Sequence, residues 1–221
     1  MASPLEKARK DPASMKGRIL GSATRLFGQN GYQGTTTRMI AKDVGIDIST
    51  LYYHWGEKGD LYGAVMTCVK EDLQQLLINI ESVIRGKPLS KRLEIAINMS
   101  CDYYFDHPEA TSLVLSHYNS DALSKSDDDK RFDIGDAITN IAFSMGLISY
   151  KANMSTQVKM KVMAVVLSLF SFIAGEGHIR QMLEVDTVEY REVVKETLRF
   201  ILIPAFIQDN YYVSGSRESF L

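Results

Sequence analysis

Cysteine and histidine are scarce in this sequence, and none of them has the spacing of a metal site. The two cysteines, Cys68 and Cys101, lie in helix-like segments, which favours reduced, buried side chains over a disulfide framework. The four histidines form no HExxH pair or similar ligand spacing. The acidic run at residues 127–129 lacks the spaced ligands and the glycine of a calcium loop. We therefore expect no metal and no cofactor.

The common catalytic motifs are also absent. No serine lies in a GxSxG turn, and no glycine-rich loop precedes a lysine as it does in a phosphate-binding loop. The triplet Gly175-Glu176-Gly177 follows a helix-like segment rather than a strand, so it is not a dinucleotide-binding fingerprint. The chain is therefore predicted not to be an enzyme, and no residue is a candidate for catalysis.

No apolar run is long enough to cross a membrane. The longest, Val162 to Ala174, is interrupted by Ser168 and Ser171 and falls short of the roughly 18–20 residues that a spanning helix needs. It is predicted to be a buried helix. The first sixteen residues are polar and contain no signal-peptide core. We expect a cytoplasmic protein without a membrane partner.

The net charge of −2 shows no nucleic-acid signature for the whole chain, but its distribution is uneven. Residues 1–60 contain nine Lys and Arg against six Asp and Glu. From totals of 25 and 27, this leaves 16 basic against 21 acidic residues for the remainder. A mildly basic N-terminal part suits contact with phosphates, and an acidic remainder does not.

The segment from Gly31 to Leu61 is predicted to form two short helices joined by a tight turn, followed by the start of a third. Threonines at 35–37 are suited to capping the first helix, and Gly45 is suited to ending it. Asp47 or Ser49 can cap the second helix, whose buried face carries Leu51 and Trp55. Two short helices with a glycine turn form a helix-turn-helix, whose second helix enters the DNA major groove.

This segment resembles the DNA-binding part of TetR-family transcriptional regulators over residues 13–73. The matching residues are Gly31-Tyr32, Thr36-Thr37-Arg38, Ile40-Ala41, Gly45-Ile46, Thr50-Leu51-Tyr52, Lys58 and Leu61. The resemblance implies an all-α fold, in which a three-helix DNA-binding domain at 13–73, with its helix-turn-helix at 36–55, precedes a larger helical domain. That second domain, residues 74–208, would bind an effector and form a homodimer, and residues 209–221 would be a tail.

Helical spacing of apolar residues predicts the other elements. Residues 1–12 are expected to be a solvated tail. The expected helices are residues 14–30, ended by Gly31, and then 58–84, 89–106, 108–119, 134–145, 156–179 and 187–208. Pro204 is expected to kink the last helix or end it early, because proline lacks the backbone donor. Residues 120–129 are expected to be a polar loop.

The residues expected to contact DNA are Thr36, Thr37, Arg38, Ile48, Ser49, Thr50, Tyr52, Tyr53, His54 and Lys58. Arg38 can form two hydrogen bonds with a guanine edge, and residues 48–50 face the groove, where small and apolar groups contact thymine methyls. The resemblance implies phosphate contacts for Thr37 and Lys58, and backbone contacts mostly for residues 52–54. A purely structural helical protein would leave this polar face without a purpose.

The resemblance further implies a repressor that a small apolar effector releases from a palindromic operator. The candidate pocket residues are Tyr103, Tyr104, Leu115, His117, Tyr118, Phe143 and Phe170. The apolar surface of the last two long helices, including Leu169, Val194, Leu198 and Ile201, is expected to form the dimer. An alternative stays open, in which the chain is a constitutive DNA-binding or architectural protein without an effector.

Overall fold

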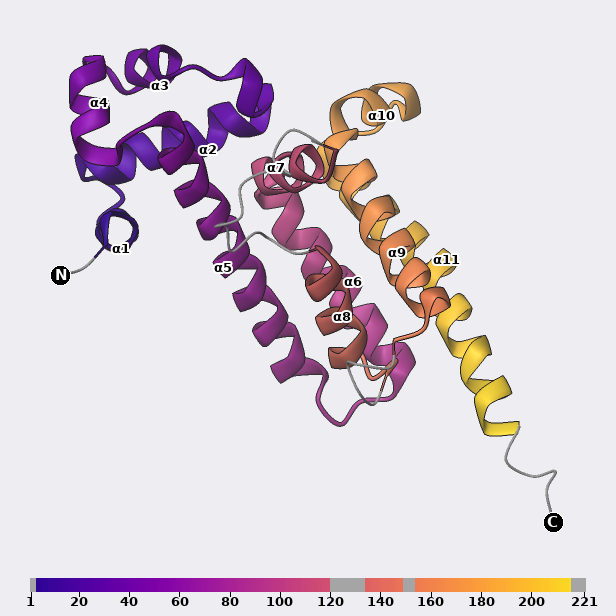
Figure 1. Cartoon of the computed structure of the whole chain (residues 1–221). Coiled ribbons are helices and arrows are strands. Elements are labelled where there is room, and N and C mark those ends of the chain that lie inside the picture. Colours follow the sequence, from indigo (N-terminus) through magenta and orange to yellow (C-terminus); the bar gives the residue numbers. More distant parts are fainter. Residues whose placement is uncertain (1–2, 120–133, 149–153, 216–221) are drawn as a thin grey trace. The chain divides into compact units, whose positions relative to one another are not determined.

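The computed structural model describes residues 3–119, 134–148 and 154–215, and its regular elements there are all α-helices (Figure 1). For residues 117–119, 134 and 208–215 it describes the backbone alone. The predicted all-α fold is confirmed, and the predicted loop at 120–129 lies outside these ranges. The chain divides into two compact units, and the long helix α5 (Lys58–Ile84) passes from one to the other at Leu73.

The first unit contains α1 (Pro4–Lys10), α2 (Met15–Gly34), α3 (Thr37–Val44), α4 (Ile48–Trp55), the first part of α5, and α7 (Pro108–Asn119) from Glu109 onward. Its core includes the fully buried Phe27, Leu51 and Leu61. The ring of Phe27 packs edge-on against Tyr62 at 5.1 Å between ring centroids. The first long helix was predicted to end at Gly31; Gly31 leaves helical geometry there with φ +67°, but this is a kink, and α2 continues to Gly34.

The expectation that residues 1–12 are a solvated tail is wrong. Ser3 and Glu6 form a capping box at the start of α1, with Pro4 at its first position. Ala8 is only 2% exposed, and Arg9 pairs with Glu71 and Asp72 of α5. The sequence signal, a serine followed three residues later by a glutamate, was present but was outweighed by the polar composition of the segment.

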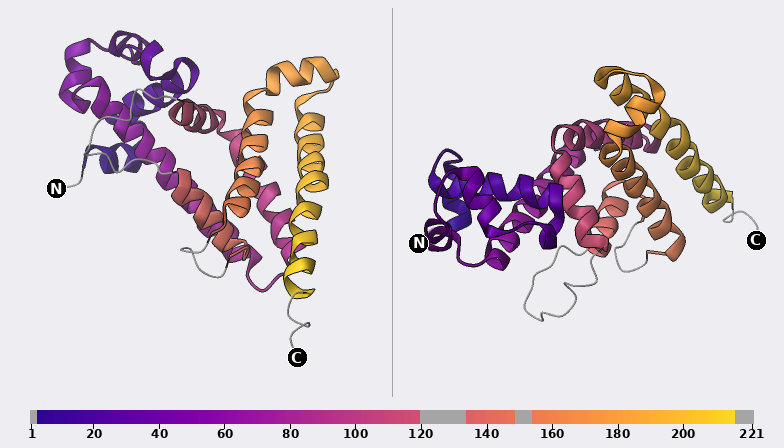
Figure 2. Two further views of the ribbon diagram at one scale, coloured as in Figure 1. Left: turned by 45° about the vertical axis from the view of Figure 1, so that its right-hand side comes forward. Right: turned by 90° about the horizontal axis from the view of Figure 1, so that it is seen from above.

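The second unit contains α5 from Gln74, α6 (Leu89–Asp106), α8 (Ile134–Ser144), α9 (Thr156–Ala174), α10 (Glu176–Leu183) and α11 (Thr187–Gly215). The helices α9 and α11 run side by side and are connected through α10 (Figure 2). One buried cluster joins five of these helices through Ile80, Leu93, Ile138, Val162 and Phe206.

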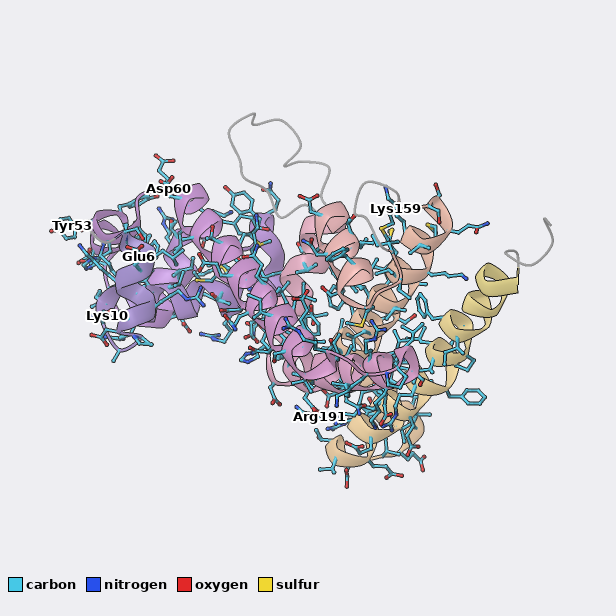
Figure 3. The ribbon with its side chains drawn as sticks, turned by 90° about the horizontal axis from the view of Figure 1, so that it is seen from below. Glu6, Lys10, Tyr53, Asp60, Lys159 and Arg191 are labelled. Atoms are coloured by element: carbon cyan, nitrogen blue, oxygen red, sulfur yellow. The ribbon has the colours of Figure 1, made fainter. Side chains whose placement is uncertain are left out.

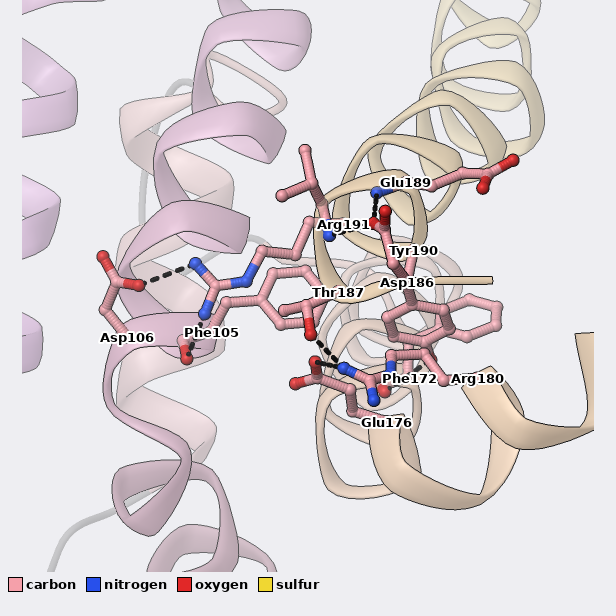
Figure 4. A network of polar contacts seen from close by, with 11 residues as sticks. Phe105, Asp106, Phe172, Glu176, Arg180, Asp186, Thr187, Glu189, Tyr190 and Arg191 are labelled. Atoms are coloured by element: carbon pink, nitrogen blue, oxygen red, sulfur yellow. Dashed lines mark hydrogen bonds and ion pairs between the residues drawn. The ribbon is translucent and has the colours of Figure 1, made fainter. Parts of the chain in front are cut away.

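Polar contacts hold the start of α11 against α6 and the end of α9 (Figure 4). Arg191 pairs with Asp106 at 2.8 Å and donates to the Phe105 carbonyl at 3.0 Å. One turn later on α11 and one turn earlier on α6, Lys195 pairs with Asp102 at 2.6 Å. The hydroxyl of the buried Tyr190 donates to the carbonyl of Phe172 at 2.8 Å. These contacts fix the position of α11 along its neighbours. The ion pairs among them add little to the stability of the fold, because their carboxylates are exposed.

The prediction of one helix from Thr156 to Ile179 is wrong, because α9 ends at Ala174 and α10 begins at Glu176. The last helix passes Pro204 and extends to Gly215 rather than ending at Gln208. A proline inside a helix removes one backbone bond, to the carbonyl four residues earlier. That residue here is Phe200, whose side chain lies on the exposed face of α11.

Helix α9 is far less buried than the sequence led us to expect. By length and composition it is the one helix within the described residues that qualifies as a membrane span. Only 22% of its apolar stretch is buried within the chain. A single helix of this kind is weak evidence for a membrane protein, because a core helix of a soluble protein passes the same test. Its apolar face therefore lacks sufficient cover from this chain.

Candidate nucleic-acid interface

The helix-turn-helix is built from two eight-residue helices with side-chain caps. The Thr36 hydroxyl accepts the Met39 amide at 3.2 Å at the start of α3, and Gly45 ends α3 in the left-handed conformation with φ +78°. Asp47 caps α4, since its carboxylate accepts the Thr50 amide at 2.7 Å. The predicted threonine cap and glycine turn are confirmed, and of the two candidate caps for α4 the structure uses Asp47.

The two faces of α4 separate as the sequence predicted. Leu51 and Trp55 are buried, whereas Ser49, Tyr52 and Tyr53 are exposed. Tyr53 is 84% exposed and projects from the end of the first unit (Figure 3). Ile48, Thr50 and His54 are half-buried. The exposed face of α4 therefore carries polar and aromatic groups without a large aliphatic patch.

Helix α2 holds α4 and α3 in place through bonds that the sequence did not reveal. The Trp55 indole donates to the Lys16 carbonyl at 3.2 Å, and the Lys16 ammonium donates to the His54 carbonyl at 3.2 Å. Arg18 donates to the Val44 carbonyl at 2.7 Å, at the C-terminal end of α3. Lys16 and Arg18 thus satisfy carbonyls that a helix end leaves unpaired. No periodicity signals such contacts, because they join residues far apart in the sequence.

Asp43 also ties α3 to α2. Its carboxylate accepts the Ser22 hydroxyl at 2.6 Å and pairs with the Arg25 guanidinium. The hydrogen bond from Ser22, and then that from Arg25, lower the pKa of Asp43 from its ordinary value of 3.8. The ionised form is therefore favoured in the folded state.

The remaining predicted DNA contacts lie on the same domain. Arg38 is exposed in the first turn of α3, and Thr37 beside it is half-buried. The Lys58 ammonium, at the start of α5, lies 4.2 Å from the centroid of the Tyr32 ring, which positions it by a cation–π contact. All ten predicted contact residues come from α3, α4, the Thr36 cap and the start of α5.

The candidate effector residues are brought together only in part. Tyr104 and Phe170 are buried in the second unit with ring centroids 4.9 Å apart, and Tyr103 lies edge-on to Tyr104 at 5.3 Å. Phe143 is exposed on α8. Leu115 is half-buried on α7, which belongs to the first unit. His117 and Tyr118 also lie on α7, and their side chains are outside the described residues.

A pair of short helices with a polar exposed face, held in place by a third helix, defines the class of helix-turn-helix DNA-binding domains. Residues 19–65 match the family model described as "Bacterial regulatory proteins, tetR family". These residues therefore form a DNA-binding domain of the TetR type.

Curated relatives match mainly over this domain. The regulator AcrR of Shigella flexneri is 29% identical over 93 residues, which are 42% of this chain and 43% of AcrR. IcaR of Staphylococcus aureus, a negative transcriptional regulator of the biofilm operon icaADBC, is 38% identical over 64 residues, 29% of this chain and 34% of IcaR. The chain thus matches less than half the length of these relatives.

Solved structures are similar over most of the chain. A TetR-like transcriptional regulator from a Rhodococcus species has a TM-score of 0.55 at 14% identity, with 83% of this chain and 92% of that chain covered. The TetR family regulator PfmR from Thermus thermophilus has a TM-score of 0.53 at 17% identity, covering 86% and 96%. At these identities the likeness establishes a TetR-like fold alone.

The lowered pKa of Asp43 predicts a pH-dependent contribution to stability. A carboxyl group with a depressed folded-state pKa stabilises the fold above its unfolded pKa and loses this contribution as the pH falls through the folded value. Asp43→Asn should therefore lower the melting temperature at pH 7, and the difference from the wild type should shrink below about pH 3.8. Thermal denaturation followed by circular dichroism measures both. Glu57→Gln, at an exposed position, is the control, and a pH-independent difference for Asp43→Asn would contradict the assignment.

Proposed function

We propose that the protein is a DNA-binding transcriptional regulator that acts as a homodimer on a palindromic operator, most simply as a repressor. The observation that carries this proposal is the exposed polar face of α4, which is held to α2 by the bonds that join Lys16 to His54 and Trp55. A rigid support suits contact with base edges, since base contacts need fixed geometry. The negative regulator IcaR supports the repressor role. A cytoplasmic location is part of the same proposal.

The contacts divide into two kinds. Arg38 and the first turn of α4 contact base edges in the major groove, where Arg38 donates two hydrogen bonds to a guanine. Thr36, Thr37, Lys58 and the residues Tyr52, Tyr53 and His54 contact the sugar-phosphate backbone and fix the register. Base contacts determine the sequence preference, and phosphate contacts determine the affinity and its salt dependence.

This division predicts different effects for two alanine variants. Arg38→Ala should cost roughly 1–3 kcal/mol at one base position and relax specificity there. Lys58→Ala should weaken binding to all sequences and reduce the slope of log affinity against log salt by about one. Fluorescence anisotropy titrations of operator and random DNA at several salt concentrations measure both. Lys87→Ala, an exposed lysine beyond α5, is the control, and the contacts are wrong if both variants bind like it.

The dimer proposal rests on uncovered apolar side chains of α9 and α11. Phe200 is 81% exposed, Ile201 56% and Met160 59%. Met160 lies fourteen residues before the end of α9, and Phe200 lies thirteen residues after the start of α11. Because the two helices are antiparallel and connected at these ends, Met160 and Phe200 lie at a similar distance from the connection. Leu169, Val194 and Leu198, which the sequence suggested for the dimer, are instead buried within the chain. A second copy of the chain would cover these exposed apolar side chains and would bring a second DNA-binding domain to the other half-site.

Sedimentation equilibrium at micromolar concentration should give about twice the chain mass of 24.8 kDa. Phe200→Glu should weaken the dimer by about 2 kcal/mol or more, because it places a charge on a desolvated apolar surface. Met182→Glu makes the same change at an exposed residue of α10, outside the helix pair, and should leave the dimer intact. A wild-type monomer with full affinity for a palindromic operator would exclude this interface.

A small apolar effector would bind in the second unit. Its buried cluster is flanked by incompletely buried apolar residues of five helices, including Leu76, Met99, Ile141 and Met163. Methionine side chains adapt to ligands of varied shape. The side-chain oxygen of Asn98 on α6 is buried without a hydrogen-bond partner, so it is available to a polar group of such a ligand.

An effector that releases the protein from DNA must obey linkage. If it weakens operator affinity tenfold, the DNA complex must bind it tenfold more weakly, a coupling of about 1.4 kcal/mol. A thermal-shift screen of apolar metabolites, followed by operator titration with each hit, measures this coupling. Asn98→Leu should weaken a polar-headed hit and spare a purely apolar one. Hits that stabilise the protein but leave operator affinity unchanged would favour the constitutive alternative.

A further inference from the structure

The first turn of α4 contains two exposed polar side chains whose hydrogen positions follow from the geometry. The Ser49 hydroxyl lies 2.6 Å from Oδ1 of Asp47, and the Thr50 amide lies 2.7 Å from the same oxygen. An ionised carboxylate only accepts hydrogen bonds, so Ser49 must be the donor. The bond from Ser49, followed by those from Thr50, lowers the pKa of Asp47, which therefore stays ionised at neutral pH.

This arrangement decides what the pair offers to DNA. A serine hydroxyl has one proton, and here Asp47 accepts it, so the remaining hydrogen-bonding capacity of Ser49 is its lone pairs. The bonds from the Ser49 hydroxyl and the Thr50 amide both end on Oδ1, and an ionised carboxylate has about four acceptor sites, so these two bonds leave it acceptor capacity. Asp47 and Ser49 are both exposed. The start of α4 thus offers hydrogen-bond acceptors from Asp47 and Ser49 and no side-chain donor from either residue.

The major-groove edges of the four bases respond differently to such a surface. Cytosine presents the N4 amino donor alone, whereas adenine presents its N6 donor beside the N7 acceptor. Guanine presents two acceptors, and thymine presents an acceptor and a methyl group. Acceptors facing acceptors repel, and an unpaired polar group in an interface is costly. Cytosine therefore suits this surface best, and guanine suits it least.

We propose that Asp47 and Ser49 together select a cytosine at one position of each operator half-site. The proposal rests on the proposed function, since it assumes that α4 enters the major groove. It changes the role expected for Ser49, from contact with a thymine methyl to acceptance of an amino proton. It also adds Asp47, which the sequence suggested only as a helix cap, to the residues that determine specificity.

The test is a selection of binding sites from a randomised duplex library with the full-length wild type, Asp47→Asn and Ser49→Ala. Asparagine keeps the helix cap but adds an amide donor, and alanine removes the serine acceptor. Glu57→Gln, which removes one exposed negative charge from the same domain, is the control. Helical content and melting temperature of each variant show that it is folded.

The wild type should prefer cytosine over guanine by roughly tenfold at one position of each half-site. Asp47→Asn should reduce this preference to about threefold or less and tolerate guanine there, and Ser49→Ala should reduce it as well. The other positions, and the motif of Glu57→Gln, should be unchanged. A motif that neither variant alters, or one with guanine or thymine at the affected position, overturns the inference while the proposed function stands. If the wild type enriches no motif, both fail.

Discussion

The DNA-binding domain depends on the attachment of two short helices to α2. An isolated helix of eight residues is not stable in water, since nucleation costs more than so few hydrogen bonds return. The helices α3 and α4 therefore keep their geometry only because Ile40, Leu51 and Trp55 are buried against their neighbours. The bonds from Lys16, Arg18 and Trp55 add direction to this packing, because each joins α2 to a fixed backbone or side-chain atom. The orientation of the exposed face of α4 follows from that attachment.

In the same domain, Asp47 both stabilises a helix and determines the hydrogen-bonding character of the surface. Asp47 is needed as a helix cap, because the first amides of α4 have no partner within the helix. Its charge also orients the Ser49 hydroxyl, so the requirement of the helix start determines the hydrogen-bonding character of the surface beside it. Asp43 has a comparable position at the end of α3, where Ser22 and Arg25 hold its carboxylate. There the interaction serves attachment alone.

The packing of the second unit is incomplete within the single chain. Helix α9 is apolar along its length, but most of that surface is not buried within the chain. Phe200 and Ile201 of the neighbouring helix α11 are exposed as well. Exposed apolar area of this extent is unfavourable in water and marks an interaction surface. The occupant that we propose for this surface is a second copy of the chain.

The sequence by itself determined the local elements: the Thr36 cap, the glycine turn at Gly45, the two faces of α4, and the ends of α5 and α6. Caps, glycines and apolar spacing act within a few residues, so they are visible in the sequence. Tertiary structure decided the rest. The docking of Arg9 depends on Glu71 and Asp72, which are distant in the chain. The apolar spacing also revealed neither the break at Gly175 nor the passage of α11 through Pro204. Burial likewise assigned Leu169 and Leu198 to the core and left Phe200 exposed, because residues of equal hydrophobicity differ only in what packs against them.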